Sequence, residues 1–181
     1  MHDNLRRLGL DVLDVVNLRL GGPFGPDDSS LEAPLTALAE LKQQGLIRHI
    51  GLSNVSRAQF DAGCKLTDIV CVQNHYNLAH RADDTLIDDL AARQIAYVPF
   101  FPLGGFRPLD LPALDSVAQN LGAPPRQVAL AWLLQRAPNI LLIAGTSSIA
   151  HLHENLAAAA LRLPVAAIAE LEGITSQPEA R

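Results

Sequence analysis

The sequence predicts an α/β fold with a parallel sheet, formed by a single domain over residues 1–181. Five short runs of apolar or β-branched residues alternate along the chain with segments whose apolar residues recur at helical spacing. No hairpin signal such as Asn-Gly separates successive runs, and strands joined by helices form βαβ units. A chain of 181 residues that is 49% hydrophobic and 18% charged can bury a sizeable core.

The first elements are the end of a helix and a strand. Leu5, Leu8 and Leu10 follow the spacing of an amphipathic helix, and Gly9 is suited to its C-cap. The run from Val12 to Leu18 is rich in β-branched residues and predicts a buried strand. Because the chain opens with the last turns of a helix that lead into a buried strand, we expect that a preceding part is missing.

The middle of the chain alternates helices and strands. Leucines at helical spacing place a helix over Leu31–Gln44, after a loop rich in glycine and proline from Gly21 to Ser30. Pro125 is suited to the first turn of the helix that it begins. The other predicted elements are strands at His49–Leu52, Ile69–Val72 and Ile95–Phe101, and helices capped by Ser56 and reaching about Lys65, from Asp83 to Arg93, Leu111 to Leu121, Pro125 to Gln135 and Val165 to Glu172.

A fifth predicted strand leads into a helix whose N-terminus lies open. Ile140–Ile143 is apolar and too short for a helix, so it predicts a strand buried on both faces. The small residues from Gly145 to Ser148 follow, and Ile149 begins the next helical pattern. A hydroxyl of Ser147 or Ser148 can cap this helix, whose free N–H groups and positive dipole end suit an anion such as phosphate. The alternative is an ordinary strand–turn–helix connection with a serine cap.

Polar, aromatic or small side chains follow every predicted strand. In a parallel α/β sheet all strand carboxyl ends lie on one rim, where ligand sites are built. Such groups could hold a planar amide, an aromatic ring and a phosphate, although Ser and Asn are also common in loops without a function. They are Asn17 and Arg19, Ser53 and Asn54, Gln73 and Asn74, Phe100 and Phe101, and Gly145 to Ser148.

Composition and spacing argue against several classes of function. A formal net charge of -5 without a Lys/Arg cluster argues against nucleic acid as a partner, and no apolar run approaches the ~18 residues of a membrane span. Cys64 and Cys71 lack the spacing of a redox pair, and no Gly-x-Ser-x-Gly motif occurs. His151 and His153 lie two apart on a helix and face different sides, so we expect no metal site. The start of the chain lacks the apolar core of a signal peptide, so a cytoplasmic protein is expected.

Six segments carry a resemblance to a known family. In order they are LRRLGLDVLDVVNL, LAELKQQGLIRHIGLSNVS, VQNHYNLAHR, FFPLGG, APPRQVALAWLLQRAPNILLIAGTSS and HLHENL. Together the segments cover most of the chain, and in this order and spacing they resemble the C-terminal part of an aldo-keto reductase. Within that family, the resemblance is to a bacterial subgroup of oxidoreductases. The resemblance implies a partial (β/α)8 TIM barrel, with about the last five βα units and without the first three strands, that binds NADPH across its C-terminal rim.

The same resemblance implies cofactor-binding roles by position. Phe100 takes the place of a Tyr that stacks on the nicotinamide ring, and stacking requires only a π face. His151 takes the place of an Arg that contacts the adenosine 2′-phosphate; His supplies one donor where Arg supplies a charged fork, so NADH stays open as a cofactor beside NADPH. By position, Ser53, Asn54 and Gln73 would bind the nicotinamide carboxamide, Phe101, Leu103 and Gly105 would line the pyrophosphate, Gly145, Thr146, Ser147 and Ser148 would receive the 2′-phosphate, and Glu154 and Asn155 would face the adenine.

The catalytic residues of the family are matched less well. Its general-acid Tyr and the supporting Lys and Asp belong to the first three strand units, and neither Tyr76 nor Tyr97 matches the motif of the acid. The His position of the family falls on Arg19, which could polarise a carbonyl, occupy the rim or form a structural ion pair with Asp14. The catalytic residues are therefore left unassigned.

The resulting prediction is an NADPH-dependent oxidoreductase that, in an intact enzyme, reduces a small-molecule aldehyde or ketone by hydride transfer without a metal. Missing strands would make this chain a truncated form with open sheet edges, through which it could self-associate. The alternatives are a non-catalytic nucleotide-binding or assembly subunit, and a remnant without function.

Overall fold

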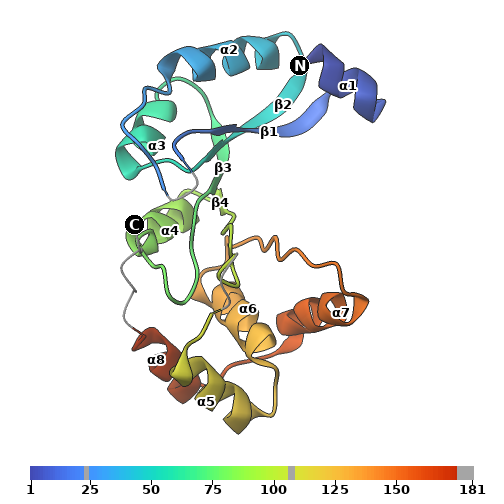
Figure 1. Ribbon diagram of the computed structural model, residues 1–181. Coiled ribbons are helices and arrows are strands. Elements are labelled where there is room, and N and C mark those ends of the chain that lie inside the picture. The colour runs from blue at the N-terminus through green and yellow to red at the C-terminus, as the bar shows by residue number, and fades with distance from the viewer. Residues whose placement is uncertain (23–24, 106–108, 175–181) are drawn as a thin grey trace. The chain divides into compact units, whose positions relative to one another are not determined.

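The chain divides into two compact units. The structure, a computed structural model, describes residues 1–22, 25–105 and 109–174. The first unit comprises Met1–Asn74 with Ile95–Tyr97, and the second comprises His75–Gln94 with Val98–Arg181 (Figure 1). Two residues of the predicted loop at 21–30, Pro23 and Phe24, lie outside the described residues.

The first unit contains a parallel sheet. Strands β1 (Leu13–Arg19), β2 (Ile47–Ser53), β3 (Ile69–Gln73) and β4 (Ala96–Tyr97) lie in the order β1-β2-β3-β4. Neighbouring strands run parallel, with Arg19 opposite Ser53 and Ser53 opposite Gln73. The carboxyl ends of β1, β2 and β3 therefore lie side by side, and the predicted α/β fold with a parallel sheet is confirmed.

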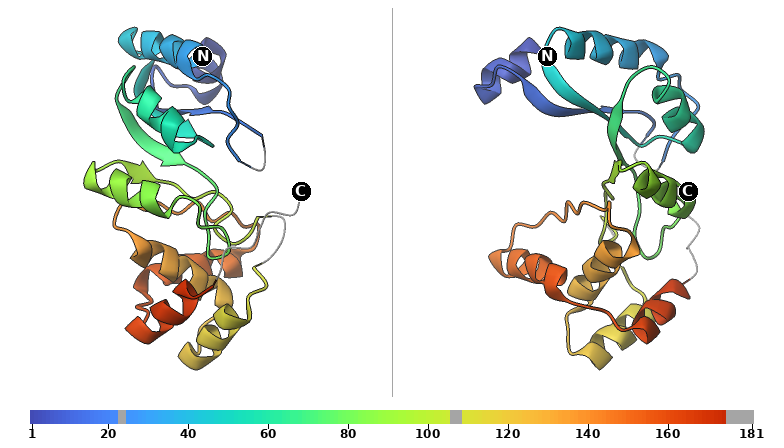
Figure 2. Two further views of the ribbon diagram at one scale, coloured as in Figure 1. Left: turned by 90° about the vertical axis from the view of Figure 1, so that its left-hand side faces the viewer. Right: turned by 180° about the vertical axis from the view of Figure 1, so that it is seen from behind.

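Helices α1 (His2–Leu8), α2 (Glu32–Gln43) and α3 (Arg57–Gly63) accompany the sheet (Figure 2). Helix α1 ends at Gly9, whose φ of 66° is the left-handed conformation that glycine adopts at little cost. Helix α3 begins with a capping box, in which Ser56 Oγ accepts from Gln59 N and Gln59 Oε1 accepts from Ser56 N. Both boundaries agree with the sequence prediction, because each depends on the chemistry of a few adjacent residues.

The sheet has an apolar face and a polar face. Ile50, Leu52 and Val72 are fully buried, and a Cβ built at Gly63 of α3 would meet Leu52 and Leu35. Helices α2 and α3 thus cover the face that carries these apolar residues. Because side chains alternate along a strand, the opposite face carries Asn17, Arg19, Gly51, Ser53, Cys71 and Gln73.

The second unit is built of helices. They are α4 (Asp84–Ala92), α5 (Pro112–Leu121), α6 (Pro125–Arg136), α7 (Ile149–Ala157), the 3-10 helix η1 (Ala158–Ala160) and α8 (Val165–Glu172). Every residue from Val128 to Leu133 of α6 is buried, and α5, α7 and η1 contact this helix. Pro112 begins α5 and Pro125 begins α6, where a missing N–H leaves no intrahelical bond unmade.

The predicted fifth strand is not formed. Beyond an isolated bridge at Ile140, the segment Ile140–Ile143 is irregular, and Leu141 and Ile143 are exposed rather than buried. An extended segment becomes a strand only where another strand satisfies its N–H and C=O groups over several residues, and beyond the single bridge at Ile140 this segment is not part of the described four-stranded sheet. The described residues therefore hold four strands instead of the five predicted.

Two further strand predictions are corrected. β4 covers only Ala96–Tyr97 of the predicted Ile95–Phe101, because Pro99 has no N–H for the ladder and Phe101 has a φ of 54°. β1 was predicted to be buried, but four of its seven residues are exposed. It is one of the two edge strands of the described sheet and pairs with β2 alone among the described strands.

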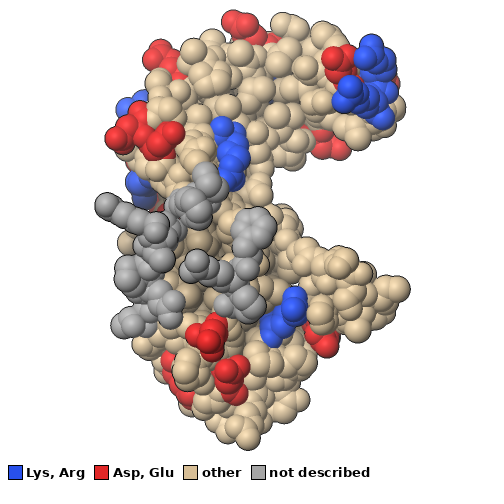
Figure 3. Space-filling view, viewed as in Figure 1, with Lys and Arg blue, Asp and Glu red and all other residues tan. Residues whose placement is uncertain are grey.

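Charged side chains are dispersed over the face of the molecule that Figure 3 shows. On the face shown in Figure 3, basic side chains lie in small separate groups, with acidic ones between them. A continuous basic stripe of the kind that binds nucleic acid is not visible on that face. Among the described helices, none has the length and apolar character needed to cross a bilayer.

Candidate functional site

Three predicted rim residues lie together in the first unit. Ser53 ends β2, Gln73 ends β3, and the two are opposite each other in the parallel register. Asn54 follows directly, and its backbone N–H donates to Gln73 O at 2.9 Å. The structure thus brings Ser53, Asn54 and Gln73 to one place, as expected for residues at the carboxyl ends of neighbouring parallel strands.

Arg19 ends β1 beside this group. Its Nη1 donates to Ser53 Oγ at 3.2 Å and its Nη2 donates to Gly22 O at 3.3 Å. Asp14, which the sequence offered as an ion-pair partner for Arg19, forms a 2.7 Å contact with Arg48. Arg19 is therefore part of the rim, where it leaves the Ser53 hydroxyl proton available as a donor.

Asn54 holds the loop that follows β1. Its side chain is buried, and Nδ2 donates to Leu20 O at 2.8 Å, Gly22 O at 2.9 Å and Gly25 O at 2.8 Å. Its φ of 56° is a left-handed conformation that Asn tolerates better than most residues. These bonds commit Nδ2, whereas Asn54 Oδ1 has no partner among the described residues.

Asn74 has a structural role that the sequence did not reveal. Its Oδ1 accepts from Val55 N at 3.0 Å, and its Nδ2 donates to Val55 O at 2.8 Å. The side-chain amide thus copies the two bonds that a neighbouring strand would make. It fixes the turn between β2 and the capping box of α3, immediately after Asn54.

Aromatic rings gather at the predicted nicotinamide position of the second unit. Phe100 stacks on His75 at 5.5 Å between centroids, and His75 stacks on His80 at 4.1 Å. Phe101 meets both Phe100 and His75 edge to face. The Phe100 ring is 8% exposed, so His75, which had no predicted role, covers part of the ring that was expected to stack on nicotinamide.

The turn after Phe101 is shaped by close packing. Asn77 Nδ2 donates to Phe101 O at 2.9 Å, and a Cβ at Gly105 would press into the Phe101 ring at 2.6 Å. Gly105 also has a φ of 67°, so no other residue fits there without strain. Leu103, another predicted residue, lies between them and is half-buried.

The N-terminus of α7 is capped as predicted. Ser148 Oγ accepts from His151 N at 3.4 Å, and Ser148 N donates to Thr146 Oγ1 at 3.1 Å. Asn155 lies one turn further on and donates from Nδ2 to Ala144 O at 3.4 Å. The remaining residues predicted for this end of the cofactor, Gly145, Ser147 and Glu154, lie in the same stretch of chain.

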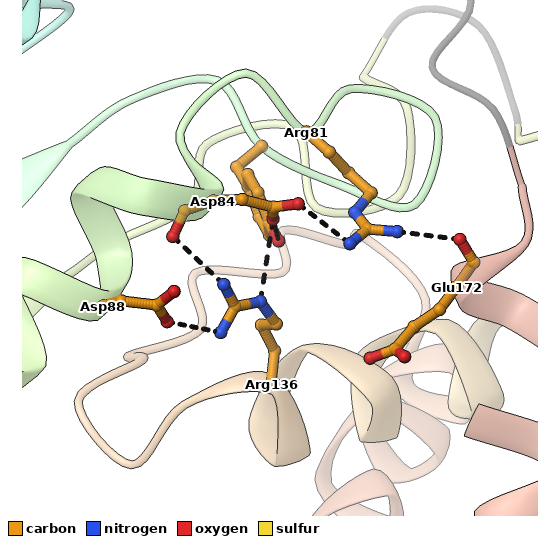
Figure 4. Close-up of polar contacts among 6 residues, drawn as sticks. Arg81, Asp84, Asp88, Arg136 and Glu172 are labelled. Atoms are coloured by element: carbon orange, nitrogen blue, oxygen red, sulfur yellow. Dashed lines mark hydrogen bonds and ion pairs between the residues drawn. The ribbon is translucent and has the colours of Figure 1, made fainter. Parts of the chain in front are cut away.

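A partly buried network of hydrogen bonds and ion pairs in the second unit was not predicted from the sequence. Tyr76 Oη donates to Asp84 Oδ1 at 2.5 Å, and Arg81 Nη2 donates to Asp84 Oδ2 at 2.8 Å (Figure 4). Arg136 reaches Asp84 O at 3.0 Å and Asp88 Oδ1 at 2.8 Å. One part of the network could have been found from the sequence, because Arg81 and Asp84 are opposite charges three residues apart near the start of a helix.

A cavity of about 240 Å³ adjoins this network. Arg81 Nη1 donates to Glu172 O at 3.1 Å, so it ties α8 to the start of α4, and its guanidinium lies 5.5 Å from the Trp132 ring. Since both arginines are paired with carboxylates, the cavity does not present free positive charge to an anion. Its lining residues are Arg81, Trp132, Gln135, Arg136, Ile168 and Glu172.

We expect the free energy of unfolding to fall as the pH rises above about 10. Burial, followed by the hydrogen bond and charge of Asp84, raises the pKa of Tyr76 well above its usual value. Tyr76 therefore has a higher pKa in the folded chain than in the unfolded chain, where it is about 10. The stability that this difference provides is fully present below pH 10 and is lost as the pH rises toward the pKa of the folded state. Urea midpoints at pH 8, 10 and 11 should fall more steeply for the native chain than for Tyr76→Phe. Equal slopes would contradict this account.

Together these features define a class. The chain is an α/β protein with a parallel sheet, and it carries hydroxyl, amide and guanidinium groups at the carboxyl ends of the strands, where such sheets bind ligands in other proteins. A profile of the Aldo/keto reductase family matches residues 1–176. The chain belongs to this family.

Individual relatives agree with this assignment. The chain is 63% identical over 179 residues to Pyridoxine 4-dehydrogenase of Escherichia coli (strain K12). The aligned residues make up 98% of this chain and 63% of the relative. It is 34% identical over 170 residues to an uncharacterized oxidoreductase of Schizosaccharomyces pombe, with 93% of this chain and 54% of the relative covered. The chain thus spans 54 to 63% of the length of these curated relatives.

Solved structures are similar as well. A thermostable aldo-keto reductase in complex with the inhibitor epalrestat matches with a TM-score of 0.84 and 30% identity, over 96% of this chain and 64% of that one. An aldo-keto reductase from Klebsiella pneumoniae in complex with NADPH matches with a TM-score of 0.81 and 26% identity, over 99% of this chain and 64% of that one.

Proposed function

We propose that the chain provides the cofactor-binding residues of an NADPH-dependent aldo-keto reductase, in which the sheet of the first unit is part of a (β/α)8 barrel. The group of Ser53, Asn54 and Gln73 at the carboxyl ends of β2 and β3 carries the proposal. Family membership and the relative in complex with NADPH support it. When bound, the nicotinamide would supply a hydride to an aldehyde or ketone.

The described residues suit the polar groups of NADPH. Asn54 Oδ1 can accept from the carboxamide N–H groups, and the Ser53 hydroxyl can donate to the carboxamide oxygen. Asn155 Oδ1 is buried and has no partner among the described residues. A buried acceptor without a donor costs about 1–3 kcal/mol, and the adenine amino group is a donor of the right chemistry for it.

The two tyrosines are unsuited to the role of general acid. Tyr76 and Tyr97 are both fully buried. The Tyr76 hydroxyl donates to Asp84 at 2.5 Å, and its raised pKa opposes release of the proton. We therefore infer that this chain binds the cofactor but does not itself provide the general acid that the reaction needs.

The substrate class follows from the relative that is 63% identical. Because that protein is named Pyridoxine 4-dehydrogenase, we propose that the intact enzyme acts on pyridoxine or on the corresponding aldehyde. An alcohol and aldehyde of this kind differ by one hydride and one proton, which is the exchange that a nicotinamide cofactor supports.

Cofactor binding and turnover can be tested together. We expect NADPH to quench the fluorescence of Trp132, the single tryptophan of the chain, with saturation. Turnover of an aldehyde panel that includes the pyridoxine-derived aldehyde should be about 10²–10⁴-fold slower than that of a full-length reductase, because a general acid contributes about that factor. Turnover at a normal rate would overturn the inference about the acid, and absence of NADPH binding would overturn the proposed function.

We expect His151→Arg to strengthen the preference for NADPH over NADH about 10–100-fold, since a charge-assisted hydrogen bond contributes about 1.5–3 kcal/mol. His151 lies in the first turn of α7, where its backbone N–H already donates to Ser148. The matched control is His151→Gln, which supplies a neutral donor and should leave the preference within about threefold. Titration of each variant with both cofactors measures the ratio of the two dissociation constants. An unchanged ratio in His151→Arg would mean that the 2′-phosphate does not bind at this end of α7.

A further inference from the structure

Three side chains form a row across the polar face of the sheet in the first unit. Cys71 Sγ of β3 donates to Asn17 Oδ1 of β1 at 3.3 Å. Asn17 Nδ2 in turn donates to Gln73 Oε1 at 2.8 Å. The row therefore begins and ends on β3, and it passes over β2 to reach a side chain of β1 on the way.

Gly51 of β2 makes this crossing possible. Asn17 and Gly51 are partners in the parallel register of β1 and β2. A Cβ at Gly51 would overlap both Asn17 Oδ1 and Cys71 Sγ, well inside van der Waals contact. Because Gly51 has no side chain, the Asn17 amide can lie over β2 and meet both residues of β3.

The row has a fixed direction. In the structure Cys71 Sγ donates to Asn17 Oδ1, and burial, which raises the pKa of the thiol, keeps the proton on the sulfur at neutral pH. Asn17 Oδ1 therefore accepts, which leaves Asn17 Nδ2 to face Gln73 Oε1. Gln73 Nε2 is left as the free end of the row, since it has no partner among the described residues.

The exposure of Asn17 indicates what the bond does. Asn17 is exposed, and Gln73 is only half-buried. An exposed amide can hydrogen-bond to water, so neither group requires the other in order to avoid a buried unsatisfied atom. The bond contributes little to folding, and its consequence is that the Gln73 amide has one orientation.

We propose that Asn17 is a positioning residue, which turns the Gln73 amide so that Nε2 donates to the carboxamide oxygen of the nicotinamide. This inference rests on the proposed function, because it assumes that Gln73 contacts the carboxamide. Gln73 as donor and Asn54 Oδ1 as acceptor are complementary to the two sides of a planar primary amide. Without Asn17, Gln73 could present either its oxygen or its nitrogen.

Two ligands separate this role from binding in general. NADPH contains the nicotinamide, whereas adenosine 2′,5′-bisphosphate contains only the adenosine end. We expect Asn17→Leu, which removes the donor without adding charge, to weaken NADPH about twofold, because about half of the Gln73 amides then still present Nε2. Asn17→Asp should weaken NADPH about tenfold, the value of one hydrogen bond of about 1.4 kcal/mol, because its carboxylate accepts from Gln73 Nε2 and turns the amide the wrong way. The bisphosphate, which lacks the nicotinamide, should bind both Asn17 variants as tightly as it binds the native chain.

The controls address folding and coupling. Asn4→Asp makes the same chemical change at an exposed position of α1, and should alter neither affinity. Urea midpoints of the Asn17 variants should stay close to that of the native chain, since an exposed bond contributes little. Combining Asn17→Leu with Gln73→Leu should cost no more than Gln73→Leu alone, because both remove the same contact.

The outcomes distinguish the two proposals. If the native chain binds neither ligand, the proposed function fails and this inference fails with it. If the native chain binds both, but Asn17→Leu weakens neither or weakens both equally, the inference alone is overturned. Additive losses in the double variant would also overturn it, because they would mean that Asn17 acts independently of Gln73.

Discussion

Replacing Asn54 by alanine should destabilise the first unit by about 2–4 kcal/mol. Three backbone carbonyls accept from its side-chain amide, and the bond to one of them, Leu20 O, is buried. Leaving that buried acceptor unsatisfied costs about 1–3 kcal/mol. Alanine also lacks the local hydrogen bonding that lets Asn hold a φ of 56°, and a left-handed conformation costs it about 1–2 kcal/mol. The loop from Leu20 to Gly25 should lose its anchor at the same time.

Asn54→Gly separates the two causes. Glycine adopts the positive φ without strain but has no side-chain amide, so Asn54→Gly should lose only the free energy of the hydrogen bonds. Urea unfolding followed by circular dichroism gives both free energies, and hydrogen exchange of β2 and of the loop shows whether the loss is local. If Asn54→Ala and the native chain unfold at the same urea concentration, the amide does not hold this loop.

Replacing Trp132 by alanine should cost the second unit about 3–5 kcal/mol, the range for deleting a buried large aromatic ring. Trp132 is 1% exposed at the centre of α6, and the Tyr76 ring stacks on it with centroids 6.0 Å apart. Its removal leaves a void beside Tyr76 and takes the aromatic surface from the Arg81 guanidinium, 5.5 Å away. The loss of packing should therefore also loosen the network around Asp84.

Trp132→Phe is the matched variant for this prediction. Phenylalanine keeps an aromatic face for Tyr76 and Arg81 but leaves a smaller void, so its cost should be clearly below that of alanine. Circular dichroism at 222 nm follows unfolding in both variants without the tryptophan signal. Equal costs for the two variants would show that volume at this position matters less than the indole N–H.

Local chemistry explains why most helices could be predicted from the sequence. The left-handed Gly9, the capping box of Ser56 and the Ser148 cap each depend on residues within one turn. The closing helix has the predicted ends, Val165 and Glu172. The strands are harder to predict, since Ile140–Ile143 has the composition of a strand but forms only a single bridge, at Ile140, and is not part of the described sheet.

The sequence predicts where the residues of the candidate site lie along the fold, but not how their side chains are oriented. The order of strands and helices places Ser53, Asn54 and Gln73 at the carboxyl ends of the sheet, and the capped α7 was expected. The hydrogen bonds that set the direction of each amide were not, because they join residues far apart in sequence. Asn17 and Gln73 lie 56 residues apart, and their contact depends on the absence of a side chain at Gly51.

The order of the strands has a consequence for how the chain is made. In the first unit each new strand is hydrogen-bonded to the strand that precedes it in the sequence, from β1 through β4. A ribosome therefore releases every strand after its partner has already emerged, so the sheet can grow by addition at one side while synthesis continues. No strand of this sheet has to wait for a distant part of the polypeptide before it finds its neighbour.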